Sequence, residues 1–168
     1  MKKFIFPFVF VFAVFMSSAQ SEFSHPGIFV GNVVEDLDKS VEFYTEVIGM
    51  TKTGEFSVPT EKCKELGLTD KYDLNVTVLK LEDSPNATEW KLMSVSTKAK
   101  HPKQKWMTDD TGMQYITILV NHLDPFIKRC KKHNVEILSK EPSKLAENRF
   151  FILVQDPDGT FIELIGPR

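Results

Sequence analysis

The sequence predicts an α+β fold in which two βαβββ modules pair into a curved mixed sheet around a cavity. Two repeats carry this prediction. Residues 34–38 (VEDLD) recur as residues 120–124 (VNHLD), and residues 88–93 (TEWKLM) recur as residues 160–165 (TFIELI). Each pair stands at the same place in an order of strand, helix and three further strands, so the chain is interpreted as a duplicated unit.

The first residues are interpreted as a targeting segment outside this fold. Lys2 and Lys3 precede an apolar run over residues 4–16, and small residues follow at 17–19. This order is typical of a secretory signal peptide, so we expect residues 1–19 to be removed and the protein to be exported, periplasmic or secreted. The apolar run is shorter than the roughly 20 residues of a spanning helix, so no stable membrane span is expected after cleavage. An uncleaved membrane anchor is the alternative.

The rest of the chain, residues 20–168, is long enough for one domain with its own core. We place module one at about residues 25–97, a linker at about residues 98–111 and module two at about residues 112–168. The linker is polar and rich in lysine, which predicts a solvated surface. The formal net charge of −2 argues against a nucleic-acid partner, which needs a basic face.

Module one begins with a strand over residues 28–34, rich in Val, Ile and Phe. Asp36 or Asp38 is expected to cap the next helix, because a carboxylate satisfies free N–H groups there. Apolar residues then recur at helical spacing until Gly49, which predicts the end of the helix. A short helix over residues 61–66 and strands over residues 51–58, 72–81 and 89–96 complete the module.

Module two begins with a strand over residues 113–120. Asp124 is expected to cap the following helix, with Pro125 at its first position and its end near Asn134. Further strands are predicted over residues 135–138, 150–154 and 160–165, with a turn at residues 156–159 between the last two.

Cys63 and Cys130 are the only cysteines. Cys130 follows Phe126 and Ile127 on the apolar face of a predicted helix, where a free thiol acts as a small hydrophobe. Cys63 lies between two lysines and is expected at the surface or in a bridge. Export permits a bridge between the two cysteines, and their spacing leaves the pairing open.

Two segments carry a family resemblance. Residues 34–44 (VEDLDKSVEFY), continuing to Gly49 and Met50, resemble the opening of a vicinal oxygen chelate (VOC) module. Residues 156–164 (DPDGTFIEL) resemble the closing strand pair of the same superfamily, which includes glyoxalase I, bleomycin- and fosfomycin-resistance proteins and extradiol dioxygenases. The resemblance implies paired modules over nearly all of the mature chain. In this family the modules pair within one chain or exchange between two chains, so a homodimer and a monomer both stay open.

The resemblance also marks four positions where metal-using members carry His, Gln or Glu, on the first and fourth strand of each module. These positions are Phe29, Lys91, Tyr115 and Glu163 here, and only Glu163 is a usual ligand. Phenylalanine has no donor atom, a protonated lysine repels a cation, and a neutral tyrosine is a weak ligand. We therefore expect no metal ion and no cofactor.

The function implied by this family and these residues is the binding of a small molecule in the concave cavity without a metal ion. Lys91 either forms an ion pair with Glu163 or meets an anionic or carbonyl group of the ligand. The alternatives are a glyoxalase- or dioxygenase-like metalloenzyme with shifted ligands and an interaction module with a filled cavity. The expected cavity residues are Phe29, Lys91, Met93, Tyr115, Phe161 and Glu163.

Overall fold

The computed structural model describes residues 22–97, 102–140 and 142–168, so the predicted signal peptide lies outside the described residues. The chain forms two four-stranded mixed sheets with the strand orders β1-β4-β3-β2 and β5-β8-β7-β6. Within these ranges, every helix is too short or too polar to cross a membrane. The two sheets confirm the predicted pair of βαβββ modules.

In module one, the signals that bound the first helix act as predicted. The Asp36 carboxylate accepts a hydrogen bond from the Lys39 N–H (3.2 Å) and caps the helix. Gly49, with a left-handed φ of 90°, ends its π-helical continuation, because this backbone conformation favours glycine. The elements of module one are β1 (Val30–Val33), α1 (Leu37–Glu42), η1 (Phe43–Ile48), β2 (Thr51–Val58), α2 (Thr60–Glu65), β3 (Leu74–Lys80) and β4 (Trp90–Val95).

Module two repeats this order, and the structure corrects two predictions in it. Asp124 is the first residue of the helix and makes no side-chain cap. Residues 135–138 are not a strand, because Val135 closes the helix through its N–H bond to the Cys130 carbonyl and β6 takes the edge beside β7. The elements of module two are β5 (Tyr115–Leu119), α3 (Asp124–Lys132), β6 (Ser143–Ala146), β7 (Arg149–Gln155) and β8 (Phe161–Gly166).

The two sheets share their strand register as well as their order. The first strand of each module runs parallel to the fourth, and Gly31 lies opposite Lys91 as Thr117 lies opposite Glu163. The positions that the repeat equates are therefore equivalent in space within each module.

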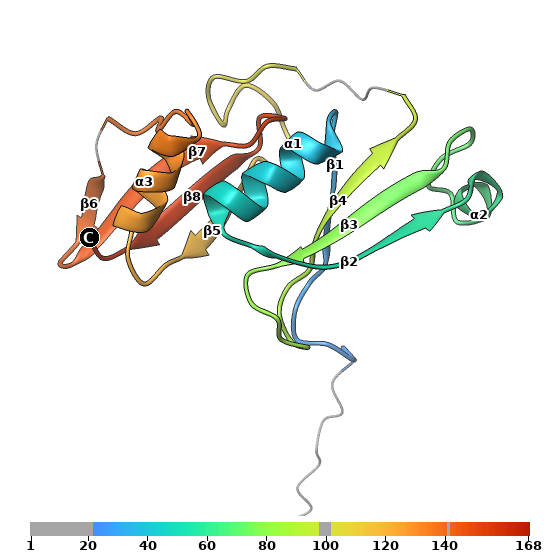
Figure 1. The fold of residues 1–168 in the computed structure, drawn as a ribbon, viewed down its shortest axis with the longest axis horizontal. Coiled ribbons are helices and arrows are strands. Elements are labelled where there is room, and N and C mark those ends of the chain that lie inside the picture. Colours follow the sequence, from blue (N-terminus) through green and yellow to red (C-terminus); the bar gives the residue numbers. More distant parts are fainter. Residues whose placement is uncertain (1–21, 98–101, 141) are drawn as a thin grey trace, which may run out of the picture.

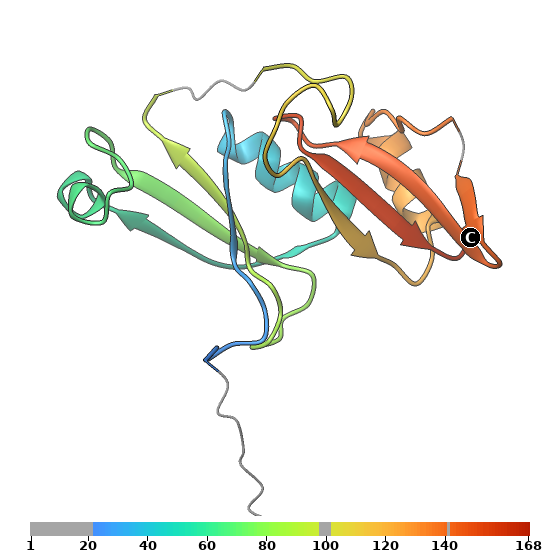
Figure 2. The ribbon, with the colours of Figure 1, turned by 180° about the vertical axis from the view of Figure 1, so that it is seen from behind.

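Helices α1 and α3 pack on the same side of the two sheets. Figure 1 shows α1 and α3 over two sheets that lie side by side, and Figure 2 shows the opposite face of those sheets. One buried cluster contains Tyr44 and Leu92 from module one together with Cys130 and Ile162 from module two. Because the modules bury one core in common, neither covers its sheet alone.

The turn between β7 and β8 fastens the two modules through polar contacts. The Tyr44 hydroxyl donates to the Asp156 carboxylate (2.8 Å). The Asp158 carboxylate accepts from the Glu35 N–H (2.8 Å) and from the Ser40 hydroxyl (3.1 Å). These contacts fix the start of α1 against module two.

Both cysteines are free and buried, so the prediction of a surface or bridged Cys63 is wrong. Cys63 packs with Leu74, Val76 and Val78, and its thiol donates to the Val58 carbonyl (3.3 Å). The flanking lysines misled the prediction because successive side chains of the short helix α2 point in different directions. Cys130 lies in the main core as a small hydrophobe, as predicted.

Candidate functional site

The candidate site lies on the face of the sheets opposite α1 and α3. In module one, Trp90 and Leu92 are buried in the core, so the alternation along β4 turns Lys91 and Met93 to the other face. Met93 covers Gly31 so closely that a Cβ at this glycine would lie 2.8 Å from the Met93 Cε atom. This half of the face is therefore partly filled by its own side chains.

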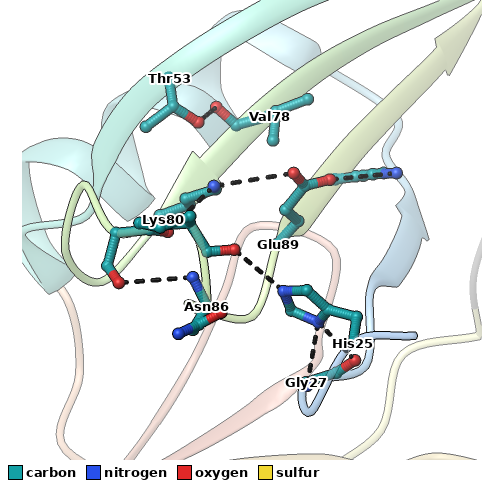
Figure 3. Close-up of polar contacts among 10 residues, drawn as sticks. His25, Gly27, Thr53, Val78, Lys80, Asn86 and Glu89 are labelled. Atoms are coloured by element: carbon teal, nitrogen blue, oxygen red, sulfur yellow. Dashed lines mark hydrogen bonds and ion pairs between the residues drawn. The ribbon is translucent and has the colours of Figure 1, made fainter. Parts of the chain in front are cut away.

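Lys91 is held by neighbours from its own module. Its Nζ atom lies 3.2 Å from the Glu89 carboxylate and 4.9 Å from the centroid of the Phe29 ring. A second ammonium group, that of Lys80, lies 3.8 Å from the same carboxylate (Figure 3). Two cations on one carboxylate leave this cluster with a local excess of positive charge.

His25 lies beside this cluster and has its own partners. Its Nε2 atom lies 2.9 Å from the Pro85 carbonyl, and the Gly27 N–H donates to Nδ1 (3.0 Å), as Figure 3 shows. The bond to the Pro85 carbonyl raises the pKa of His25. The ring also lies 5.0 Å from that of Phe29. His25 therefore ties the chain before β1 to the β3–β4 turn.

Of the two alternatives for Lys91, the ion pair with Glu163 is wrong. Lys91 pairs with Glu89, which lies two residues earlier and directly before β4. The Glu163 carboxylate instead accepts a hydrogen bond from the Thr117 hydroxyl (2.5 Å), because the β5–β8 register sets these two residues opposite each other. Each residue is satisfied inside its own module.

In module two, one predicted cavity residue, Phe161, lines a hollow. Ile162 and Leu164 are fully buried in the core, so Phe161 and Glu163 point to the other face of β8. Phe161 is only 1% exposed although it lies on this open face. The hollow beside it holds about 390 Å³. It is lined by Lys105, Trp106, Met107, Thr108, Leu138, Ser139, Phe151, Leu153 and Phe161.

The described part of the linker forms the outer wall of this hollow. The Gln155 side-chain amide donates to the Gln104 carbonyl (3.2 Å), which holds the linker against the end of β7. The Asp109 carboxylate accepts the N–H groups of Lys105 (2.8 Å) and Trp106 (2.9 Å), which fixes the loop that carries these side chains. Trp106 is thus placed by backbone contacts and not by its own burial.

The structure brings one predicted cavity residue, Phe161, into the hollow and sets Glu163 next to it, across the strand pair from the lining residue Leu153. Tyr115 pairs with Phe161 from β5 and is half exposed. The sequence analysis did not predict that the linker lines the hollow, because its many lysines indicated a solvated surface. The dipeptide Trp106–Met107 is the signal that was available, since large apolar side chains seldom sit in a polar linker without packing.

The four positions marked by the family resemblance do not fit a divalent cation. Phe29 offers no donor, the Lys91 ammonium is engaged with Glu89, and Glu163 is the one carboxylate among them. Across the described ranges, groups of three or more His, Cys, Asp or Glu that could hold a metal ion are absent. A cation in this face would lack the three or more convergent ligands that Zn²⁺ and similar ions need.

Comparisons with known proteins agree with the fold. The family model of the Glyoxalase/Bleomycin resistance protein/Dioxygenase superfamily matches residues 28–164. A glyoxalase family protein from Bacillus cereus superposes with a TM-score of 0.71 at 19% identity, over 88% of this chain and 96% of that one. The trypanothione-dependent glyoxalase I of Leishmania major gives 0.60 at 25% identity, over 82% and 84%. Glyoxalase I from Zea mays gives 0.64 at 22% identity, over 82% of this chain and 43% of that one.

Proposed function

Because the chain belongs to the Glyoxalase/Bleomycin resistance protein/Dioxygenase superfamily, we propose that it is an exported member that binds a small molecule without a metal ion. The ligand occupies the hollow of about 390 Å³ on the open face of module two. Export is supported by the charged, apolar and small-residue segments of residues 1–19.

The observation that carries this proposal is the lining of the hollow. Its walls are mainly aromatic and aliphatic, with a few polar groups at Lys105, Thr108 and Ser139. Small-molecule sites have this composition, and their volumes run from about 300 to 1,000 Å³. A hollow of this size accommodates a two-ring compound.

The metal-free part of the proposal is supported by the residues at the four ligand positions. Lys91 and Phe29 contact each other where two ligands would otherwise stand, and a cation there would meet a positive charge. The metalloenzyme with shifted ligands has no comparable support among the described side chains, which gather no alternative ligand set.

Calorimetric titration of the purified protein with 2-naphthamide, a neutral two-ring probe, tests the proposal. We expect saturable binding that persists in EDTA. Trp106→Ala removes a wall of the hollow and is expected to weaken binding about tenfold, through lost apolar contact and ring stacking.

Leu66→Ala is the matched control, because Leu66 is nearly as exposed as Trp106 (55% against 62%) but lies outside the hollow. It should leave the affinity unchanged. The proposal is overturned if the probe does not bind, if both variants behave alike, or if EDTA abolishes binding and added metal restores it.

A further inference from the structure

We infer that the natural ligand of this hollow is an aromatic or otherwise apolar molecule with one acidic group, which Lys105 receives at the rim. This inference rests on the proposed function and adds the chemical class of the ligand. Two observations support it: the side chains that line the hollow are mostly apolar, and the charged one, Lys105, has an ammonium group available to a ligand.

The aromatic and aliphatic side chains that line the hollow indicate that most of the ligand is apolar. Phe151 and Leu153 of β7 and Phe161 of β8 form the floor on the sheet, and Trp106 and Met107 face them from the linker. Three of these five side chains are aromatic rings, which favour flat or ring-bearing partners through stacking and edge contacts.

The positive charge in the lining indicates that the ligand carries an acidic group. Lys105 is the one ionisable residue among the described lining residues. Its Nζ atom lies 5.4 Å from the centroid of the Trp106 ring, a cation–π contact at a solvent-exposed site. Such a contact leaves the ammonium N–H groups available, because an aromatic face accepts charge without taking up all three donors.

Neither neighbouring carboxylate forms an ion pair with the Lys105 ammonium in the part of the chain that the structure describes. The Asp109 carboxylate accepts two backbone N–H groups, at Lys105 and Trp106, and so is turned to the backbone of the loop. Glu163 lies across the strand pair from Leu153 and accepts the Thr117 hydroxyl. An acidic ligand therefore places its charged group at the Lys105 end, and its rings over Phe161.

Ser139 supplies a second polar anchor in the same lining. Its hydroxyl is buried and has no hydrogen-bond partner among the residues that the structure describes. A buried hydroxyl without a partner is costly, so a ligand recovers that cost if the Ser139 side chain turns into the hollow and bonds to it.

Paired probes test the class of ligand. The protein is titrated with 2-naphthoate and with 2-naphthamide, which share their rings and differ in charge. We expect naphthoate to bind more tightly than the amide, with an affinity that falls as salt is added. Lys105→Gln should weaken naphthoate binding about two- to fivefold and leave amide binding unchanged, as befits an exposed ion pair.

Lys128→Gln is the control, because Lys128 is an exposed lysine of α3 on the helical side of the sheets and outside the hollow. Its naphthoate affinity should equal that of the wild type. Equal binding of acid and amide, with no effect of Lys105→Gln, overturns the ligand class and leaves the proposed function standing. Failure of both probes to bind the wild type overturns the proposed function itself.

Discussion

Ser40 and Ser139 both have buried hydroxyl groups, and they differ in whether the hydroxyl has a partner. The Ser40 hydroxyl donates to the Asp158 carboxylate (3.1 Å), whereas the buried Ser139 hydroxyl has no partner within the described chain. Removing a buried group that is satisfied costs stability, and removing one that is not relieves a penalty. The pair therefore separates the stabilising role of a hydroxyl from a role in binding.

We predict that Ser40→Ala lowers the free energy of unfolding by about 1.5–3 kcal/mol, because the lost bond is to a charged acceptor. Ser139→Ala should leave it unchanged or raise it by about 1 kcal/mol. Urea denaturation followed by circular dichroism measures both. A large loss of stability in Ser139→Ala would show that this hydroxyl has a structural partner and is not free for a ligand.

Asp156 gives a prediction about pH. Burial raises the pKa of its carboxyl above the ordinary 3.8, outweighing hydrogen bonds such as those from the Tyr44 hydroxyl and the Thr160 N–H. A folded pKa above the unfolded one means that the group's contribution is complete below pH 3.8 and is lost as pH rises through the folded pKa.

The wild type should therefore lose part of its stability advantage over Asp156→Asn as pH rises from about 4 towards neutrality, by at most about 1.4 kcal/mol per pH unit. Urea denaturation of both proteins at several pH values measures this difference. Asp83→Asn is the control, since Asp83 is exposed, and its difference from the wild type should stay nearly constant. An advantage that grows with pH would contradict the raised pKa.

Helices α2 and α3 each carry one buried thiol, that of Cys63 and that of Cys130. Both cysteines are fully buried and free, and burial raises the pKa of the Cys130 thiol, which lowers its share of reactive thiolate. We predict that a thiol-specific reagent modifies neither cysteine in the folded protein and modifies both in urea, with or without prior reduction. Rapid labelling of Cys63 before unfolding, or recovery of both thiols only after reduction, would contradict this arrangement.

The sequence predicted the elements whose ends are set by local chemistry. Gly49 ended the first helix and Asp36 capped it, because a left-handed turn and a free N–H make demands that few residues meet. The strand predicted over residues 135–138 is wrong, although its composition is typical of a strand. Val135 and Ile137 pack against the core instead, and β6 forms the edge of the sheet. Strand pairing at an edge depends on the whole chain and not on the segment.

The candidate site was less predictable than the elements. The repeat placed Lys91 and Glu163 on the correct face, because side chains alternate along a strand. The repeat could not predict the partners of these two residues. Lys91 meets Glu89 because their side chains reach each other along the chain, and Glu163 meets Thr117 through the register of β5 and β8. Trp106 lies outside both repeats, so the duplication gave no information about the wall that the linker supplies.

For the whole molecule, the arrangement of the modules leaves apolar surface at two sheet edges. β1 and β5 are each the terminal strand of a sheet and lie beside each other in the middle of the molecule (Figures 1 and 2), and Val33, Tyr115 and Leu119 on them are exposed. Exposed apolar side chains that lie close together favour association with another chain. The sequence left a monomer and a homodimer open, and from this exposed apolar surface we predict that two copies of this protein associate.

Light scattering after size exclusion should give twice the mass of one chain at micromolar concentration. Leu119→Lys should shift the protein to the monomer by burying a charge in the contact. Leu66→Lys changes an exposed leucine on the loop after α2 and should leave the mass unchanged. A wild type that stays monomeric at every concentration would contradict the association.

We propose that this member of the superfamily binds a small molecule in its hollow without a metal ion. The most direct measurement is elemental analysis of the purified protein after incubation with Zn²⁺, Ni²⁺, Mn²⁺ or Fe²⁺ and gel filtration, with Glu163→Gln in parallel. We expect far less than one ion per chain in both proteins, and 2-naphthoate binding that EDTA does not change. One tightly held ion per chain in the wild type that is lost in Glu163→Gln would contradict the proposal.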